Sequence, residues 1–328
     1  MSTVGRLIAR SMNRMGFGEQ SCRLISSDPS ILLYHGVTDE PRHGIVNCTG
    51  KHVSVDRFEK QLAAVARYRK MVPLVELVSR LRDQKPCRDM VAVTFDDGYL
   101  NNLECAAPVL QRLGIPATFF LATGFIGVPR WMWQDRLESA LESSREPAIR
   151  GEVLPEVEPI DSDDRKRSVL RRINAILKSM NWQDAEAKAL QLAAQLGGER
   201  CEPHGLYRFM SWDHVRKLAG QGFDIGAHSV NHAILSRIDL GEAQREIRES
   251  AQHVRDQTGD CCRVFCYPNG KPDDYNPEVV NFCREHFSAA LSTTWGAARG
   301  ERMYELARII VDDDTTPATL AGWVAGAG

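Results

Sequence analysis

The sequence predicts an α/β protein, an irregular (β/α)7 barrel with a helical insertion, and three observations support this prediction. Seven short apolar or β-branched runs are typical of strands, centred near residues 33, 93, 119, 225, 265, 291 and 309. Most of these runs are separated by segments in which apolar residues recur at helical spacing, and such alternation indicates a parallel sheet. Polar clusters directly follow several of the runs. They stand at the carboxyl ends of the expected strands, where the active and ligand-binding sites of α/β proteins lie.

The length and composition agree with one barrel that carries an insertion. The chain has 328 residues, 43% of them hydrophobic, which is enough for one large core or two modest ones. Its formal charge of -2 gives no broad positive field, so we expect no nucleic-acid partner. We expect a basic helical segment over residues 1–27, the barrel over 28–320 with its insertion at about 129–210, and a C-terminal tail over 321–328.

The N-terminal segment carries Arg6, Arg10 and Arg14 at every fourth position, which predicts a short basic amphipathic helix. Two interpretations stay open: weak association with an anionic membrane surface, or a terminus that docks on the core or lacks fixed structure. No apolar run is long enough to span a membrane, and the apolar core of a secretory signal is missing. Since the nine cysteines also favour a reduced chain, we expect a cytoplasmic protein, peripheral at the inner membrane face if the helix binds lipid.

The barrel elements follow one another along residues 28–320. Apolar residues at helical spacing predict each helix, with Pro73 at a helix start and Gly114 at a helix end. Short apolar runs bounded by turn residues predict each strand. The expected elements are strand 31–37, helices 54–69 and 73–81, strand 91–95, helix 103–113, strands 117–122 and 223–227, helix 241–257, strand 263–267, helix 277–286, and strands 288–293 and 306–311.

The insertion differs from the barrel in its pattern. Long helical periods rich in Arg, Glu, Lys and Leu run from 129 to 210, with a polar break around 151–164. Trp131 and Trp133 stand at its start. Two interpretations of these tryptophans stay open, an aromatic platform for a sugar ring or ordinary packing of the insertion against the barrel.

Two adjacent carboxylates follow the strand 91–95. Asp96 and Asp97, with Gly98 after them, come at the end of a run whose composition fits a strand covered on both faces. Because successive strand residues point to opposite sides, one carboxylate can bind a cation while the other handles a proton. An Asp-Asp-Gly turn on the surface is the alternative interpretation.

A pair of histidines follows the strand 223–227. His228 and His232 are four residues apart, and we expect them to project from one face of a helical turn. Asp97 would complete a set of two imidazoles and one carboxylate, which suits a divalent transition metal and leaves positions for water and substrate. The pair by itself is also typical of a solvated helix face, but the second polar cluster at another strand end favours the metal site.

These motifs resemble those of a known family. Residues 94–98 and 228–232 are similar to the first two motifs of the NodB-homology polysaccharide deacetylases, carbohydrate esterase family 4, and residues 265–270 to the third. The resemblance extends over roughly 28–315, although the segment between 128 and 211 matches nothing in the family pattern. It implies the irregular barrel. It also implies a metal-dependent hydrolase that removes an N-acetyl or other N-acyl group from an amino sugar of a polysaccharide, an oligosaccharide or a lipid-linked glycan precursor.

The resemblance also implies roles for single residues. Asp97, His228 and His232 are the expected metal ligands, with zinc as the first choice and cobalt, nickel or iron suited to the same donors. Asp96 is the expected general base. Two substrate or oxyanion candidates stand at the end of strand 263–267, its last residue Tyr267 and the backbone N–H of Asn269 in the loop that follows.

The sequence departs from the common family pattern in two places. Cys266 stands where many members have an arginine that orients the base, and the C-terminal Leu-x-His motif that supplies the acid is missing. Members with rearranged strand order look like this, with the acid histidine in an N-terminal Tyr-His. We therefore expect His35 as the general acid and Arg308 as the partner of Asp96, with Arg263 as the alternative partner. Cys266 itself is expected to be a structural or incidental thiol.

Other functions remain as alternatives. An O-acyl esterase or a non-sugar amidase would use the same metal site. A non-catalytic carbohydrate-binding relative would have lost site residues, whereas both carboxylates and both histidines are present. The expected partner is a carbohydrate or glycolipid, and the cytoplasmic features favour a precursor or glycolipid over an external polymer.

Overall fold

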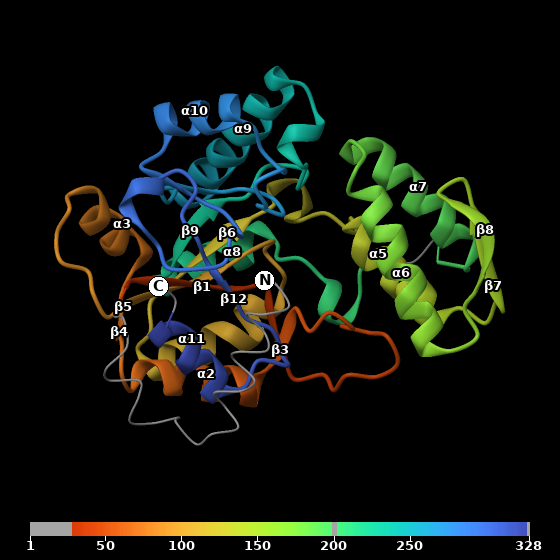
Figure 1. The fold of residues 1–328 in the computed structure, drawn as a ribbon, viewed down its shortest axis with the longest axis horizontal. Helices are drawn as coiled ribbons and strands as arrows, with labels where there is room; N and C mark the ends of the chain where they lie inside the picture. The colour runs from red at the N-terminus through yellow and green to blue at the C-terminus, as the bar shows by residue number, and fades with distance from the viewer. Residues whose placement is uncertain (1–27, 199–201, 327–328) are drawn as a thin grey trace.

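The computed structural model describes residues 28–198 and 202–326, so the expected N-terminal helical segment over 1–27 lies outside the described residues. An eight-stranded sheet forms the centre, and every strand pair in it is parallel (Figure 1). The strand order is β11-β10-β9-β6-β5-β1-β12, with β4 beside β5. The strands are β1 Ser30–Tyr34, β4 Lys70–Met71, β5 Met90–Phe95, β6 Ala117–Leu121, β9 Asp224–Ala227, β10 Val264–Cys266, β11 Ala289–Leu291 and β12 Ile309–Ile310.

The sheet curls into an irregular barrel. A parallel bridge between Leu291 in β11 and Leu306, just before β12, links the two ends of the strand order. The predicted fold class is confirmed, and all seven predicted barrel strands are present. The eighth, β4, was not predicted, because a strand of two residues is too short to show a periodicity.

The alternation of side chains along the strands separates the inside of the barrel from its helical cover. In β5, Val91, Val93 and Phe95 belong to the large core that the outer helices share, whereas Ala92 belongs to a second cluster with residues from the other strands. Both faces of the strand are therefore buried, which is why it appears in the sequence as one apolar run. The covering helices are α2 Val55–Ala66, α3 Leu74–Arg82, α4 Ala107–Leu113, α8 Trp212–Gly220, α9 Leu240–Thr258, α10 Pro277–His286 and α11 Pro317–Gly326.

Three local predictions are wrong. The strand expected over 31–37 divides at His35 into β1 and β2, Gly36–Thr38, and β2 pairs with β3, His52–Ser54. The helix expected over 103–113 begins with a π-helical segment, Asn102–Ala106, before α4. The expected tail from residue 321 is part of α11, which packs against α2 and buries apolar side chains. None of the helices in the described part of the chain is long and apolar enough to cross a membrane.

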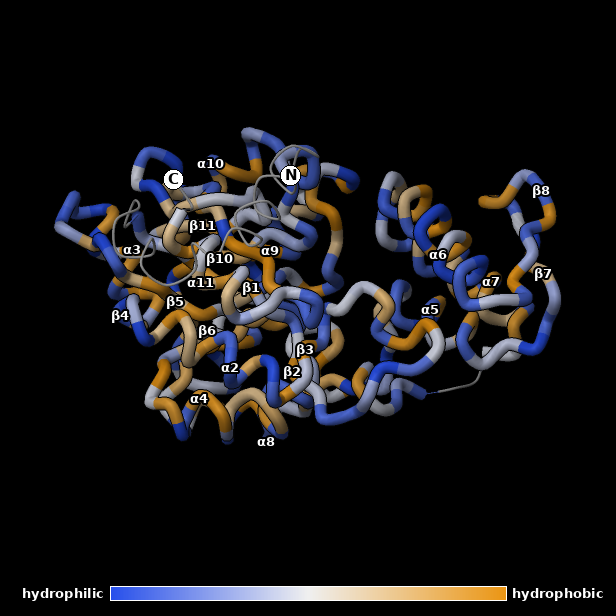
Figure 2. The backbone as a smooth tube through the Cα atoms, turned by 60° about the horizontal axis from the view of Figure 1, so that its bottom comes forward, coloured by the Kyte–Doolittle hydropathy of each residue, from blue (hydrophilic) through white to orange (hydrophobic). Residues whose placement is uncertain are grey.

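The insertion has a hydrophobic cluster of its own. Figures 1 and 2 show its elements grouped at one side of the barrel. Its buried residues, Leu137, Ile173 and Leu192 among them, form a cluster separate from those of the barrel. The polar break expected around 151–164 is largely an antiparallel hairpin, whose short and mostly exposed strands carry no apolar run. The insertion elements are α5 Trp133–Ser143, β7 Ala148–Gly151, β8 Leu154–Pro159, α6 Asp163–Leu177 and α7 Trp182–Gln195.

The chain returns from the insertion onto the loop that follows β5. The Leu100 N–H donates to the Arg208 carbonyl at 2.7 Å, and the Met210 N–H donates to the Gly98 carbonyl at 3.1 Å. The insertion and the Asp-Asp-Gly loop are therefore joined by backbone hydrogen bonds.

Candidate active site

The two carboxylates lie at the carboxyl end of β5. The Asp96 N–H donates to the Tyr34 carbonyl of β1 at 3.0 Å, and the Asp97 carbonyl accepts from the Ala122 N–H, just after β6, at 3.1 Å. Asp97 has a φ of 76°, which is costly for a residue with a side chain and persists only where the surroundings enforce it. The neighbouring strands therefore hold the carboxylate loop in a fixed shape.

The two histidines lie in a loop after β9, so the helical turn expected for residues 228–232 is wrong. Ser229 and His232 both have left-handed backbone, with φ of 61° and 53°, which breaks any helical path. Glu246 of α9 holds this loop. Its Oε2 accepts the N–H groups of Val230 and Asn231 at 2.8 and 2.7 Å, and its Oε1 accepts the Asn231 side-chain amide at 2.6 Å.

Asp97, His228 and His232 converge despite this change of backbone. The Nε2 atoms of His228 and His232 lie 3.6 and 3.4 Å from Asp97 Oδ1, and one donor atom from each residue fits within 4.8 Å of the others. His228 Nδ1 donates to the Cys266 carbonyl at 2.9 Å, which leaves its Nε2 as the lone-pair atom on the side of Asp97. The structure thus brings together the three predicted metal ligands.

The donor set fits a divalent metal ion. Asp97 Oδ1 is buried without a hydrogen-bond partner, and an unsatisfied buried carboxylate oxygen is costly unless a cation completes its environment. Burial raises the pKa of Asp97 to about 7, against the opposing charge of Lys51 and with the support of Asp96. Burial lowers the pKa of both histidines, which keeps the imidazoles neutral and able to donate lone pairs.

Asp96 is paired with Arg308. The guanidinium donates to both carboxylate oxygens, Nη1 to Oδ1 at 2.9 Å and Nη2 to Oδ2 at 2.8 Å, and neither side chain is more than 3% exposed. Burial by itself would raise the pKa of Asp96, but Arg308 and nearby histidines hold it well below its usual range. Arg308 is fixed in turn by the Ser292 carbonyl, which accepts from its Nε at 2.9 Å.

His35 lies at the break between β1 and β2 and is half-buried. Burial lowers its pKa to about 3, although the negative charge of Asp96 opposes this shift. The structure brings His35 within electrostatic reach of Asp96 and Arg308, and it is neutral at pH 7. A general acid at this position must therefore receive its proton during the reaction.

Cys266 was expected to be a structural or incidental thiol, and its buried contacts with Asp96 and Arg308 fit the structural interpretation. Its Sγ lies 3.4 Å from both oxygens of Asp96 and 3.1 Å from Arg308 Nη2. Cys266 points into the barrel because it alternates with Phe265 and Tyr267, which pack in the outer core. Arg308 therefore reaches Asp96 from the residue just before β12, and the Cys266 thiol lies beside the pair.

Tyr267 is not available to a substrate. Its hydroxyl donates to the Tyr304 carbonyl at 3.0 Å, its ring stacks on Tyr275, and its N–H donates to the Leu291 carbonyl. The expectation of a substrate or oxyanion role for Tyr267 is therefore wrong. Asn269, in the loop that follows, is half-buried and has a left-handed φ of 56°.

Of the two open interpretations of the tryptophans, the aromatic platform does not fit Trp131. Its side chain is 3% exposed and packs with Leu206 and Tyr207. Trp133 is partly buried and packs against the core of the insertion. The alternative interpretation, ordinary packing, accounts for both side chains.

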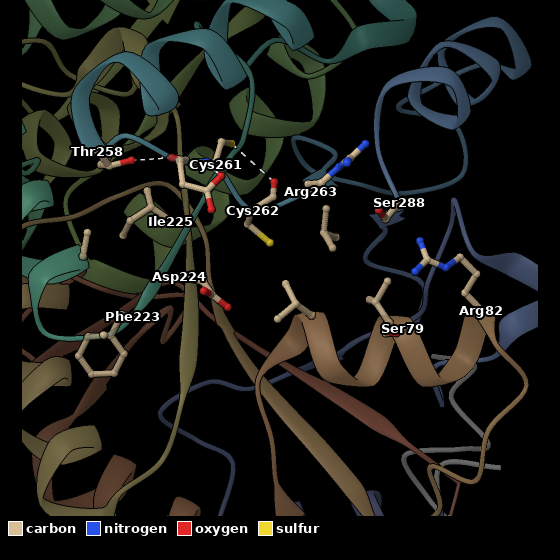
Figure 3. Close-up of a pocket in the computed structure, with 16 residues that line it drawn as sticks. Ser79, Arg82, Phe223, Asp224, Ile225, Thr258, Cys261, Cys262, Arg263 and Ser288 are labelled. Carbon is tan, nitrogen blue, oxygen red and sulfur yellow. Dashed lines mark hydrogen bonds between the residues drawn. The ribbon is translucent and has the colours of Figure 1, made fainter.

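Arg263 is not the partner of Asp96. It is exposed at the start of β10 and lines a cavity of about 610 Å³ together with Asp224 and Cys262 (Figure 3). These residues stand at the amino ends of β9 and β10, whereas Asp96 and the histidines follow the carboxyl ends of their strands. This cavity and the cluster of Asp96, Asp97 and the two histidines therefore lie at opposite ends of the sheet.

Sequence reasoning missed a polar network beside the carboxylates. Lys51 donates to the Tyr99 hydroxyl at 2.8 Å and to Asp135 Oδ1, and Tyr99 donates to Asp135 Oδ2 at 2.6 Å. Of these three residues, only Tyr99 could have been noticed in the sequence, since it directly follows the Asp-Asp-Gly motif. Lys51 and Asp135, like Glu246, come from distant segments and show no local pattern.

The chain is similar to known proteins in its sequence and in its fold. The family model described as polysaccharide deacetylase matches residues 83–156 and 160–286, more than half of the chain. The putative polysaccharide deacetylase YxkH of Bacillus subtilis (strain 168) is 32% identical over 71 residues, 22% of this chain. That match spans 25% of the relative's length.

Solved structures share the fold. The Streptococcus pyogenes deacetylase PplD, in complex with acetate, superposes with a TM-score of 0.60 at 17% identity, over 90% of this chain and 98% of that chain. IcaB from Ammonifex degensii has a TM-score of 0.57 at 17% identity, over 92% of this chain and 99% of that chain. At this identity the likeness is evidence for the fold alone.

Proposed function

Since the chain belongs to the polysaccharide deacetylase family, we propose that it is a metal-dependent hydrolase that removes the N-acetyl group of an amino sugar. The observation that supports this proposal most directly is the convergence of Asp97, His228 and His232 beside Asp96, a second carboxylate that the metal set does not need. Amide hydrolysis requires an activated water, a polarised carbonyl and a proton for the departing nitrogen. The site offers a group for each of these tasks.

The cofactor is proposed to be a divalent cation, zinc in the first place, with cobalt, nickel or iron suited to the same donors. The chemistry that such a cation supplies when bound is a lowered pKa for the attacking water and polarisation of the acyl carbonyl. Asp97, His228 and His232 would hold it.

The proton path runs through Asp96 and His35. Asp96 accepts a proton from the attacking water as the water oxygen bonds to the carbonyl carbon. Because Arg308 stabilises the ionised carboxylate, protonated Asp96 is a strong acid and passes the proton readily to the neighbouring His35. His35 then protonates the sugar nitrogen as the carbon–nitrogen bond breaks, and acetate and a free amine result. The backbone N–H of Asn269 is the proposed oxyanion donor.

The substrate is proposed to be an N-acetylated amino sugar of a polysaccharide, an oligosaccharide or a lipid-linked glycan precursor. A second candidate, O-acyl esterase activity at the same site, is favoured by one observation. Burial keeps His35 neutral, and an alcohol departs with less need of a strong proton donor than an amine does.

The test compares acetate release from N-acetylglucosamine oligomers and from O-acetylated sugars by protein reconstituted with Zn²⁺ or Co²⁺. Preferential release from the N-acetylated oligomers supports the deacetylase. Preferential release from the esters supports the second candidate. The control is Asp97→Ala, which is expected to abolish release from both substrates, and release that survives this change would contradict the proposed site.

A further inference from the structure

Lys51 occupies a place beside the proposed general acid. It directly precedes β3, and its carbonyl accepts from the Gly36 N–H. The parallel register of β2 and β3 pairs Gly36 with His52, so the preceding residues, His35 and Lys51, are neighbours. A Cβ added to Gly36 would lie 2.1 Å from His52 Nδ1, so the backbone at this point is closely packed.

Two buried acceptors hold the Lys51 ammonium group. Tyr99 is fully buried, and the Asp135 side chain is 3% exposed, whereas the Lys51 side chain is 21% exposed. Tyr99 and Asp135 are bonded to each other, so the two anchors form a rigid pair. Asp135 belongs to α5, and the insertion therefore supplies one of the two groups that fix Lys51.

One donor of the ammonium group remains. A lysine side chain carries three N–H donors, and within residues 28–198 and 202–326 the structure records two acceptors for Lys51. The Lys51 ammonium group is held by Tyr99, two residues beyond Asp97, and Lys51 neighbours His35 in the register of β2 and β3. Its charge reaches both groups, since it lowers the pKa of Asp97 and of His35.

We propose that Lys51 is a further catalytic residue, whose third N–H donates to the acyl oxygen of the substrate as negative charge develops on it. This inference rests on the proposed function. His35 delivers a proton to the departing nitrogen, and the acyl oxygen is bonded to the same carbon as that nitrogen. A donor that neighbours His35 is therefore close to the atom on which the charge appears. Asp96 and Asp97 would repel that charge, and a preorganised ammonium group offsets them.

The competing explanation is that Lys51 and Asp135 form a purely structural ion pair. This explanation does not account for the partial exposure of Lys51. A buried salt bridge is often no more stabilising than apolar residues of the same volume. The Lys51 side chain is 21% exposed, whereas its two acceptors, Tyr99 and Asp135, are enclosed. A side chain that is partly exposed and held in place by two buried acceptors is suited to donate a hydrogen bond to a substrate.

The test uses Lys51→Met together with the double variant Lys51→Met/Asp135→Asn, which removes both charges and avoids an unpaired carboxylate. With N-acetylglucosamine oligomers, both variants are expected to lose on the order of 10²-fold in kcat with little change in KM. The rates are compared at saturating metal, with metal occupancy checked by calorimetry, because the charge of Lys51 lowers the pKa of Asp97, one of the expected metal ligands. Lys51→Arg is expected to recover part of the loss, and Lys60→Met, at an exposed lysine paired with Asp56, is the control without effect.

A second measurement is independent of the sugar. Acetate carries the oxygen atoms of the acyl product, so the metal-loaded Lys51→Met protein is expected to bind acetate about tenfold more weakly than the wild type, the loss of one charged hydrogen bond. If the wild type releases acetate from no sugar, the proposed function fails, while acetate affinity still tests Lys51. Unchanged acetate affinity, or a loss of kcat that follows only a loss of metal, overturns the role of Lys51.

Discussion

Arg308 binds both carboxylate oxygens of Asp96, at 2.9 and 2.8 Å, although 212 residues separate the two in the chain. The pair is buried at the carboxyl end of the barrel strands, next to the thiol of Cys266. It keeps Asp96 ionised beside Asp97 and the two histidines, and this state is the one that a proton acceptor needs.

Arg308→Met is expected to reduce both stability and activity. Removal of one partner leaves a buried charge uncompensated, at a cost of about 3–5 kcal/mol in the free energy of unfolding. The folded-state pKa of Asp96 lies below its ordinary value of 3.8, so the pair stabilises the fold above that pH. The stabilisation is lost as the pH falls through the lowered pKa. Denaturant unfolding at pH 7 and pH 3 should show a larger deficit at pH 7.

The pH profile of Arg308→Met separates the catalytic role of the pair from its structural role. Without the guanidinium the pKa of Asp96 rises, so the acid limb of kcat is expected to move to higher pH than in the wild type. Arg308→Lys keeps the charge and is the matched control, with a smaller shift. An acid limb that stays in place in Arg308→Met would contradict the assignment of Asp96 as the base.

Metal affinity is expected to fall as the pH is lowered through 7. Burial raises the pKa of Asp97 to about 7, and a protonated carboxyl must lose its proton before it binds a cation. Each pH unit below 7 should weaken Zn²⁺ binding about tenfold, with a plateau above 7. The histidines add no further slope near neutrality because burial lowers their pKa values. Calorimetric titration of chelator-stripped protein on both sides of neutral pH measures this dependence, and a flat profile would contradict it.

Glu246→Gln is expected to weaken metal binding while the fold is retained. The carboxylate accepts three hydrogen bonds from the loop between His228 and His232, and an amide loses one oxygen acceptor. Changes in groups that support metal ligands typically cost about 10–100-fold in affinity. Zn²⁺ titration and thermal unfolding measure the two effects, and Glu249→Gln, exposed on the same helix, is the control. Equal affinities in the two variants would mean that Glu246 does not position the ligands.

Trp131→Ala is expected to lower stability without a specific effect on KM. The side chain is 3% exposed, and truncation of a buried aromatic residue costs about 3–5 kcal/mol. Thermal unfolding and KM for N-acetylglucosamine oligomers are the measurements. A raised KM at unchanged stability would restore the sugar platform that the burial of Trp131 argues against.

The sequence by itself determined the parallel barrel, the position of the insertion and the ends of the strands at which the polar groups gather. These features are readable because buried parallel strands leave contiguous apolar runs, and the polar residues that follow them mark the carboxyl ends. The set of Asp97, His228 and His232 could be predicted for the same reason, although the backbone that carries the histidines is a loop instead of a helical turn.

Only the tertiary structure decided which distant side chains meet. It decided between the expected partner of Asp96, Arg308, and the alternative, Arg263, in favour of Arg308. It also brought Cys266 into the site and buried Trp131. It also joined Lys51 to Asp135 of the insertion. The spacing of apolar residues in the sequence indicates the local secondary structure and its burial. Contacts across a barrel depend on the strand order and on which face of each strand turns inward, and these contacts leave no local pattern in the sequence.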